Sequence, residues 1–348
     1  MRHTDYDLAQ MQSLPLKYKI TMTQQRIRAW YEHYDGLVYV SFSGGKDSTV
    51  LKHIVDNMYS DVPSVFINTG LEYPEIQKFA KSQKNVVTLF PSMRFDEVIK
   101  KYGYPVISKE TSLAIYFARK SKKNGTPLNY KAKQLYGMIT REDGSKSMFD
   151  KSKYQYLVNA PFNSANQCCD VMKKRPAKKY EKETGRKPIV ATLADESNSR
   201  RTAWKKNGCN AFEAKRPMST PLAFWTEQDI LHYIKLYNVP YCSVYGDIRV
   251  KQDDEQIDGQ INVVDYLEDY KAGEDILETT GCDRTGCIFC MFGCHLEKSP
   301  NRFERLKETH PRQYEYCIGG GQYVDGILQP NKEGLGLGKV LDYIGVKY

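Results

Sequence analysis

Residues 43–48 read Ser-Gly-Gly-Lys-Asp-Ser, a stretch whose residue types and spacing suit it to bind phosphate. An alternating apolar run precedes it and a helical pattern follows, so a strand should enter a tight turn that opens a helix. The two glycines let the backbone approach an anion, and the first N–H groups of the helix point toward it. The lysine adds a cation and the two serines add hydroxyl donors. We therefore expect phosphate contacts from Ser43, Gly44, Gly45, Lys46, Asp47 and Ser48.

Asp47 distinguishes this loop from a simple phosphate cradle. A carboxylate among phosphates indicates either a metal-binding role, with Mg²⁺ as the expected ion, or a helix-capping role. The spacing also fails the Walker A pattern, because Val40 stands where its first glycine should be and Asp47 follows the lysine. We expect Lys46 and Asp47 to take part in catalysis.

A second set of residues suited to chemistry lies near the carboxyl end. Four cysteines fall within thirteen residues with the spacing C-x4-C-x2-C-x3-C, namely Cys282, Cys287, Cys290 and Cys294. Such thiolate density predicts an iron–sulfur cluster or a tetrahedral zinc site. Zinc ribbons usually have two separated C-x2-C pairs and this region has one, so we favour an iron–sulfur cluster over zinc. The four cysteines could supply every ligand, or some ligands could come from elsewhere in the chain.

The elements that must position these residues alternate between strand and helix. Apolar runs at 37–42, 65–68, 86–90 and 188–193 read as strands, and amphipathic stretches follow the first three. This alternation predicts an α/β fold with a doubly wound, mostly parallel sheet. Ligands of such sheets bind beyond the carboxyl ends of the strands, where the loop at 43–48 and the turn at 68–72 both lie.

Length and composition set the broad class of the protein. The chain has 348 residues, nine cysteines and a formal net charge of +9. It shows no long apolar run and no apolar leader at its start, so we expect a cytoplasmic protein with no membrane contact. We divide it into an N-terminal helical segment (1–36), a nucleotide-binding α/β domain (37–245) and a C-terminal region with the cysteines (246–348).

Two charged insertions interrupt this order. The first spans about 112–166, and between 119 and 153 it has ten Lys or Arg against three acids, interleaved with aromatic residues. Such a pattern suits nucleic acid, but charge runs more often face water, so we favour a solvated insertion with a hairpin at Asp143-Gly144. The second, 247–278, has eleven acids against three bases. The two could pair within one chain or between the subunits of a homo-oligomer.

The loop at 43–48 resembles the PP-loop of the ATP pyrophosphatase and PAPS-reductase-like (adenine nucleotide α-hydrolase) superfamily. The resemblance implies a Rossmann-like fold and an ATP or related nucleotide bound through its phosphates. Three further stretches match the superfamily: the turn Asn68-Thr69-Gly70, the Cys-x-x-x-Lys-x-x-Pro helix that begins at Cys169, and a Trp-Thr-x-x-Asp-Ile stretch at 225–230, which we interpret as structural. A fourth, Glu-Ser-x-x-Arg, implies a nucleotide or substrate pocket formed by Glu196, Ser197 and Arg200. We expect Arg200, which is suited to grip phosphate or sulfate oxygens, to be a third catalytic residue.

The resemblance also implies a second set of cluster ligands. The Cys-Cys…Cys-x-x-Cys pattern of [4Fe–4S] sulfonucleotide reductases is similar to Cys168, Cys169, Cys287 and Cys290. Cys287 and Cys290 belong to both sets. We favour Cys282, Cys287 and Cys290 together with one of Cys168, Cys169 or Cys294.

Three functions follow as hypotheses. The first is an ATP pyrophosphatase that releases AMP and pyrophosphate and adenylates an acceptor for sulfur transfer, similar to phosphorothioation ATPases and tRNA thiolases, with sulfur-donor proteins as partners. The second is a PAPS or APS reductase, although those enzymes generally have a degenerate loop and a C-terminal nucleophile that this chain lacks. The third is a nucleotide- or nucleic-acid-binding module without activity, because Asn68 replaces the superfamily's acid.

Overall fold

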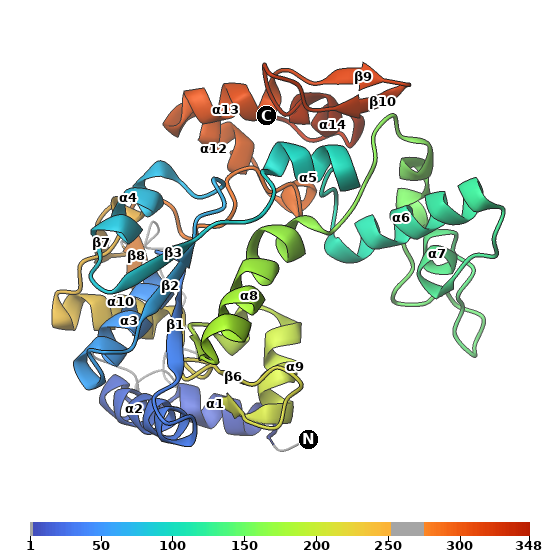
Figure 1. The fold of residues 1–348 in the computed structure, drawn as a ribbon. Coiled ribbons are helices and arrows are strands. Elements are labelled where there is room, and N and C mark those ends of the chain that lie inside the picture. Colours follow the sequence, from blue (N-terminus) through green and yellow to red (C-terminus); the bar gives the residue numbers. More distant parts are fainter. Residues whose placement is uncertain (1–2, 252–274) are drawn as a thin grey trace, which may run out of the picture. The chain divides into compact units, whose positions relative to one another are not determined.

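Six short strands form the central sheet of the computed structural model, which describes residues 3–251 and 275–348 (Figure 1). They lie in the order β3-β2-β1-β4-β6-β5. All neighbouring pairs are parallel except β5 with β6. The predicted α/β fold with a mostly parallel sheet is thus confirmed, and its four predicted strands are β1 (Val38–Phe42), β2 (Ser64–Ile67), β3 (Val86–Leu89) and β4 (Lys187–Val190). The short strands β5 (Asn210–Ala211) and β6 (Met218–Ser219) complete it.

The chain forms two compact units, each assembled from three segments. Unit 1 consists of residues up to 67, 73–89 and 179–285, and it contains the whole sheet. Unit 2 consists of residues 68–72, 90–178 and 286–348. Segments of the two units therefore alternate along the sequence, whereas the domains expected from the sequence are contiguous ranges.

Alternation along β1 shows how unit 1 covers both faces of its sheet. Val38 and Val40 point into the main hydrophobic core. Tyr39, between them, points to the other face, where its hydroxyl donates to Glu181 Oε1 at 2.7 Å and its ring packs on Tyr180. The strand is buried on both faces, as expected for a central parallel strand.

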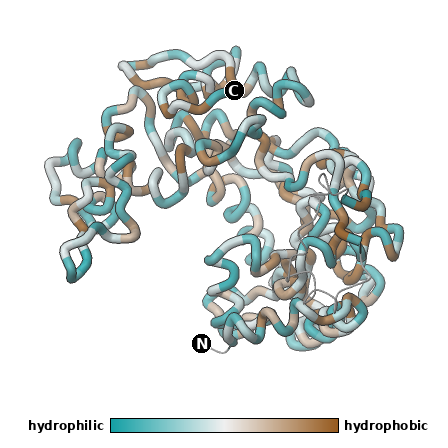
Figure 2. The backbone as a smooth tube through the Cα atoms, turned by 180° about the vertical axis from the view of Figure 1, so that it is seen from behind, coloured by the Kyte–Doolittle hydropathy of each residue, from teal (hydrophilic) through white to brown (hydrophobic). Residues whose placement is uncertain are grey.

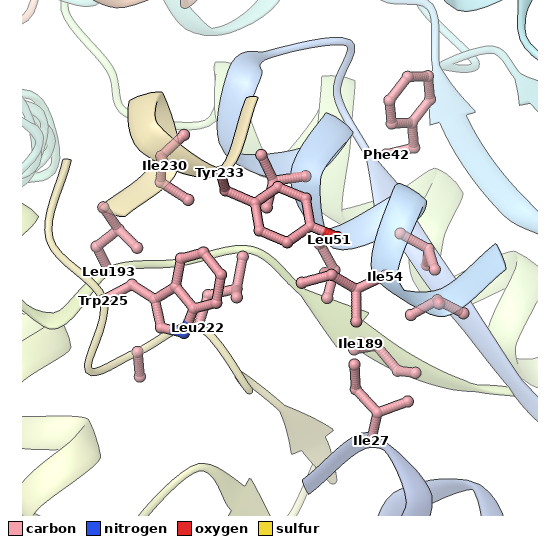
Figure 3. Close-up of a cluster of buried hydrophobic side chains, with 14 of the residues drawn as sticks. Ile27, Phe42, Leu51, Ile54, Ile189, Leu193, Leu222, Trp225, Ile230 and Tyr233 are labelled. Carbon is pink, nitrogen blue, oxygen red and sulfur yellow. The ribbon is translucent and has the colours of Figure 1, made fainter. Parts of the chain in front are cut away.

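The core of unit 1 lies between the sheet and a layer of helices. Leu51 and Ile54 of α3 meet Ile230 of α10 here, together with Ile189 of β4 and the ring of Trp225 (Figure 3). The helices of unit 1 are α1 (Asp5–Gln12), α2 (Leu16–His33), α3 (Lys46–Met58), α4 (Pro74–Ser82), α9 (Asn198–Asn207) and α10 (Glu227–Tyr237), with the 3₁₀ turns η3 (Ala194–Glu196) and η4 (Ser243–Tyr245). Helix α8 (Arg175–Thr184) crosses from unit 2 into unit 1.

The start of α10 is fixed by a buried polar network. Thr226 caps the helix and Asp229 completes the capping box, as the Trp-Thr-x-x-Asp pattern predicts. The carboxylate of Asp229 also accepts from Lys19 Nζ at 2.7 and 2.8 Å, and both side chains are buried. Because a buried charge needs a partner, this pair ties α2 to the first turn of α10.

Unit 2 is mainly helical. It contains α5 (Phe95–Tyr102), α6 (Lys109–Asn124), α7 (Tyr130–Leu135), α12 (Arg302–Thr309), α13 (Pro311–Ile318) and α14 (Leu337–Tyr343), the turns η1 (Ser152–Asn159), η2 (Asp170–Lys174) and η5 (Cys294–Leu296), and the hairpin of β9 (Gln322–Val324) with β10 (Ile327–Gln329). Hydrophilic and hydrophobic residues alternate along these elements (Figure 2), as amphipathic packing requires. No helix within the described residues has the length and apolar character needed to cross a membrane.

The structure describes the whole basic insertion and only the two ends of the acidic one. The basic insertion contains α6 and α7, and the predicted hairpin is present, with Gly144 at φ +78° and a bridge between Thr140 and Lys146. Most of the acidic insertion lies outside the described residues. Its flanks form an antiparallel pair, β7 (Ile248–Val250) with β8 (Leu277–Thr279).

Candidate functional site: a phosphate loop and a cysteine cavity

The loop at 43–48 joins β1 to α3 in the predicted strand–turn–helix arrangement. Gly44 has φ +75°, and a Cβ there would lie 2.9 Å from Ile76 Cγ2, so only glycine fits without strain. The two serines close the turn, since Ser43 N donates to Ser48 Oγ at 3.2 Å and the two hydroxyl oxygens lie 3.0 Å apart. Helix α3 begins at Lys46, so its first N–H groups face the turn.

This loop opens on a cavity of about 320 Å³ within unit 1. The cavity is large enough for a small polar ligand, and most of its lining residues are polar or charged. The lining residues are Ser43, Gly45, Lys46, Asp47, Ser48, Ala191, Leu193, Glu196, Arg200, Glu227, Tyr245, Asp283, Arg284 and Thr285.

Lys46 is held in the wall of this cavity. Its buried ammonium group pairs with Glu227, the first residue of α10, and donates to the carbonyl of Asp283 at 2.5 Å. Its backbone N–H donates to the hydroxyl of Tyr245 at 3.3 Å, and that hydroxyl lies 2.7 Å from Thr285 Oγ1. The cation is thus fixed by segments more than 180 residues away in sequence.

Glu196 gathers two arginines on the other side of the cavity. Its carboxylate pairs with Arg200 and lies 3.3 Å from Arg284 Nη2. Asp47 is also in this wall, and burial raises the pKa of its carboxyl group above the ordinary value, although the charges of Lys46 and Arg284 oppose the shift. The lining of the cavity therefore combines three basic residues with four acidic ones, and an arriving anion could take over the cations from Glu196 and Glu227.

The predicted pocket residues divide between the two units. Lys46, Asp47, Glu196 and Arg200 line one cavity, whereas Ser197 caps α9 by accepting from Arg200 N at 3.4 Å. Asn68, Thr69 and Gly70 belong to unit 2, where Thr69 donates to Glu72 from its backbone at 3.0 Å and from its hydroxyl at 2.7 Å. Their contact with a nucleotide stays a prediction.

Sequence reasoning missed five polar lining residues, Glu227, Tyr245, Asp283, Arg284 and Thr285, as well as the apolar Ala191 and Leu193. The sequence pattern marks Glu227 only as the start of a helix. Tyr245 ends the short turn η4, and Asp283, Arg284 and Thr285 lie in a loop, so no periodic pattern marks these four residues. The one available signal was the short run Asp283-Arg284-Thr285 just before Cys287, which placed an arginine beside a chemically distinctive stretch.

Four cysteines line a small, mainly apolar cavity in unit 2. Cys168 and Cys169 precede η2, and Cys287 and Cys290 come from the carboxyl-terminal segment, 118 residues or more away; Leu71, Phe95, Pro105, Met172, Lys173 and Phe289 complete the lining. The cavity volume is about 20 Å³, room for a single water molecule. Within residues 3–251 and 275–348, no three His, Cys, Asp or Glu side chains are arranged closely enough to hold a metal ion.

Charge around these thiols favours the thiolate form of one of them. A hydrogen bond from Cys168 and the ammonium groups of Lys109 and Lys173 hold the pKa of Cys169 well below its usual range. The same hydrogen bond and burial raise the pKa of Cys168. Burial raises the pKa of Cys287 to about 11.

The remaining cysteines lie apart from this cavity lining. Cys294 is buried in unit 2. Cys282 belongs to unit 1, where its N–H donates to Val244 O at 3.0 Å. Cys209, Cys242 and Cys317 are buried, as expected for thiols without metal-type spacing. Unit 2 thus brings together the Cys168, Cys169, Cys287 and Cys290 set, while the choice of cluster ligands stays a prediction.

Comparison with known proteins shows the family of the chain. The sequence matches the phosphoadenosine phosphosulfate reductase domain over residues 37–107 and 128–292, more than half of the chain. The chain belongs to this family. The matched segments of this family member include the loop at 43–48 and five of the six predicted cluster cysteines; the sixth, Cys294, lies just beyond them.

Two curated relatives of this phosphoadenosine phosphosulfate reductase family member differ in coverage. Sulfate adenylyltransferase subunit 2 of Agrobacterium fabrum is 23% identical over 263 residues, 71% of each chain. An uncharacterized protein of Methanocaldococcus jannaschii is 34% identical over 86 residues, which are 23% of this chain and 21% of the relative. The chain therefore spans about a fifth of that relative's length.

Two solved structures are also similar to it. The phosphoadenylyl-sulfate reductase of Candida auris has a TM-score of 0.36 at 16% identity, covering 64% of this chain and 82% of that one. The U34-tRNA thiolase NcsA of Methanococcus maripaludis, solved with its [4Fe-4S] cluster, has a TM-score of 0.32 at 14% identity, covering 74% of this chain and 76% of that one.

Proposed function

We propose that this member of the family binds ATP at the loop 43–48, cleaves it to AMP and pyrophosphate, and adenylates an acceptor for sulfur transfer. One observation carries the proposal: the Ser-Gly-Gly-Lys-Asp-Ser loop is complete and opens on a cavity that also contains Arg200 and Arg284. A substrate without β and γ phosphates would not need a complete pyrophosphate loop.

The residues of the cavity have distinct roles in this reaction. The acceptor attacks the α-phosphorus, the bond from that phosphorus to the bridging oxygen breaks, and pyrophosphate leaves with the bonding electron pair. AMP leaves in the second step, when sulfur displaces it from the adenylated acceptor, or directly when water takes the acceptor's place. Lys46 and the first N–H groups of α3 stabilise the charge on the departing pyrophosphate. Arg200 contacts phosphate oxygens at the α position. Asp47 offers the oxygen ligand that Mg²⁺ prefers, and bound Mg²⁺ would neutralise phosphate charge.

The cysteine cavity fits the sulfur part of the proposal by its donor chemistry. Four soft thiol ligands and an apolar wall suit an iron–sulfur cluster better than a hard cation. Cys168, Cys169, Cys287 and Cys290 would hold this [4Fe–4S] cluster, and Lys173 would offset its negative charge. When bound with one cysteine on each iron, the cluster would supply electron transfer and local charge for the sulfur chemistry, and it would leave no iron open to an external sulfur atom.

The test is ATP turnover by the anaerobically purified full chain and three variants. Lys46→Ala and Asp47→Ala are each expected to lower the rate of AMP and pyrophosphate formation by at least ~100-fold, since each removes charge stabilisation of the transition state. Lys52→Ala is the control, because Lys52 is a buried lysine of the same helix that pairs with Asp56 at 2.7 Å and does not line the cavity. Wild-type turnover by Lys46→Ala and Asp47→Ala would contradict the assignment.

The second candidate is a PAPS or APS reductase, which the family match itself favours. A Cys-Cys pair beside a C-x2-C pair also fits [4Fe–4S] sulfonucleotide reductases. This function predicts sulfite release from PAPS or APS with thioredoxin and no ATP cleavage. A chain that binds nucleotide but turns over neither substrate would instead be a binding module.

A further inference from the structure

The basic insertion is a folded element of unit 2 whose charged side chains are mostly exposed to solvent. Arg119 of α6 ties η1 down, since its Nε donates to Val158 O at 3.0 Å and its Nη2 to Leu157 O at 3.2 Å. These bonds lie over a small core of side chains that are buried, namely Ala114, Ile115, Ala118, Ala132, Leu135, Leu157 and Val158. The insertion therefore presents its exposed side chains on a folded surface, where a partner could bind them.

That surface exposes large apolar side chains that the core does not use. The exposed fractions are 36% for Tyr116, 56% for Tyr130, 62% for Met138, 75% for Met148 and 56% for Phe149. Lys120, Lys122, Lys123, Lys133, Arg141, Lys146 and Lys153 are also exposed. We call these twelve residues the insertion surface.

Aromatic and basic residues share faces of the two helices. On α6, Tyr116, Lys120 and Lys123 recur at spacings of four and three, which places them on one face. On α7, Tyr130 and Lys133 are three residues apart and both exposed. A partner that meets either face therefore contacts a ring and an ammonium group together.

The positive charge of this segment favours a partner that carries negative charge. Ten basic residues against three acids between 119 and 153 leave an excess of seven, most of the chain's net +9. Few acids offset the exposed cations: Lys146 Nζ lies 3.9 Å from Asp150 Oδ2, and that oxygen also accepts from Ser152 at 2.7 Å. Cations suit phosphates, and exposed rings suit bases that are free to stack, a combination found for single strands and not for acidic peptides or regular duplexes.

The insertion is also anchored beside the cysteine-bearing segments of its own unit. Tyr154 of η1 lies 3.0 Å, hydroxyl to Nε2, from His295, which follows Cys294. At the other end, Lys109 is the first residue of α6. Just before it, Ile107 accepts from Gly293 N at 2.8 Å.

We propose that the insertion surface binds single-stranded nucleic acid and holds it near the cysteine cavity as the acceptor of sulfur. The sulfur-acceptor part rests on the proposed function, and the binding part does not. RNA and single-stranded DNA share the chemistry that the surface offers, so the experiment distinguishes them.

The test is fluorescence anisotropy of labelled mixed-sequence RNA and DNA strands of about 20 nucleotides, with the full chain and without ATP. The triple variant Lys120→Gln, Lys123→Gln, Lys133→Gln should bind at least ~10-fold more weakly than wild type. Its slope of log affinity against log salt should be smaller by about two, because each lost phosphate contact removes ~0.7. Whichever of RNA and single-stranded DNA binds more tightly is identified as the ligand.

The matched control removes the same charge elsewhere. Lys178, Lys179 and Lys182 are exposed lysines of α8, and changing all three to Gln should leave affinity and slope near those of wild type. Tyr130→Ala with Phe149→Ala should weaken strand binding about tenfold and leave the salt slope unchanged, since stacking carries no charge. Equal losses in the two lysine triples, or wild-type binding by the insertion triple, would overturn the proposal.

A second measurement uses only the wild-type chain. Strands that contain 5-iodouridine should cross-link under ultraviolet light to peptides that contain Tyr116, Tyr130 or Phe149, and cross-links confined to other peptides would refute the location. ATP cleavage by the insertion triple is expected to equal that of wild type. The two proposals can fail separately. If wild type cleaves ATP but does not bind strands, this proposal fails and the proposed function stands. If wild type binds strands through the insertion surface but Lys46→Ala still cleaves ATP normally, the proposed function fails and the binding proposal stands.

Discussion

The phosphate-loop cavity of unit 1 and the cysteine cavity of unit 2 contrast in size, polarity and origin. The first measures about 320 Å³ and is lined by charged groups, whereas the second measures about 20 Å³ and is lined by thiols and apolar side chains. Five residues of the loop 43–48 line the first, while two distant pairs of cysteines line the second. A local motif suits phosphate, which backbone N–H groups can bind, whereas the thiols of the second cavity are side-chain ligands that come from two separate segments.

The sequence nevertheless connects the two regions closely. Thr285 is the last residue of unit 1 and lines the phosphate cavity, and Cys287 follows two positions later in unit 2. One short segment, residues 283–290, therefore contributes lining residues to both cavities. The variants below separate the two regions, from the largest expected effect to the smallest.

The largest effect is expected on iron content. Cys287→Ser should lose nearly all iron and sulfide after anaerobic purification, because Cys287 belongs to both possible ligand sets and serine is a poor cluster ligand. Cys317→Ser is the control, since Cys317 is fully buried and its thiol lies in no proposed ligand set.

The same iron analysis decides between the ligand sets. Cys168→Ser and Cys169→Ser should reduce iron as strongly as Cys287→Ser, while Cys282→Ser should not. Iron loss in Cys282→Ser with retention in both Cys168→Ser and Cys169→Ser would favour the local set of four.

The next effect concerns the backbone of the phosphate loop. Gly44→Ala places a Cβ 2.9 Å from Ile76 Cγ2 at φ +75°, so it should lower ATP affinity about tenfold and stability by about 1–2 kcal/mol. Gly125→Ala has a similar φ of +63° and meets nothing within 4 Å. Isothermal titration should show normal ATP affinity for Gly125→Ala, and an equal loss in both variants would show that the loop geometry is not specific.

Sequence reasoning predicted features formed by neighbouring residues well, and it predicted contacts between residues distant in sequence poorly. The strand, turn and helix around Lys46, and the capping box of Thr226 and Asp229, follow from residues within a few positions of each other. The pairing of Lys46 with Glu227 and of Glu196 with Arg284 joins residues 88 to 181 positions apart, and only the fold brings them together.

Two other features show the same limit. The residues 68–70 fall in a unit other than the one that contains the loop, although strand order places both after neighbouring strands. The basic insertion has its own buried core because alanines and branched residues are spaced helically within a charged stretch, and overall charge hid that pattern.

A smaller effect is expected from pH. Burial holds the pKa of Asp47 above its ordinary 3.8, so its carboxylate is lost on acidification at a higher pH than for an exposed aspartate. ATP cleavage should therefore fall as pH drops through this raised pKa. Between 3.8 and the raised pKa the folded chain binds this proton more tightly than the unfolded chain, so this group's contribution to stability decreases as pH rises.

The measurement is the rate of ATP cleavage across mildly acidic to neutral pH. Asp47→Asn should remove this step from the profile and leave a low rate that does not depend on this group. An acid limb that is identical in wild type and Asp47→Asn would assign the titration to another residue.

The smallest effects are expected at helix caps. Thr226→Ala in unit 1 and Ser108→Ala in unit 2 should each lower the free energy of unfolding by about 1 kcal/mol, because each hydroxyl accepts a backbone N–H at a helix start. Only Thr226→Ala should also raise the KM for ATP, since α10 positions Glu227. Equal KM changes in the two variants would show that the caps act through overall stability.

The central claim is that the complete loop selects ATP over a sulfonucleotide. The most direct test is to give the anaerobically purified chain ATP in one reaction and PAPS with thioredoxin in another, and to identify the products of each. The account predicts AMP and pyrophosphate from ATP and no sulfite from PAPS. Sulfite release from PAPS with ATP left intact would contradict it.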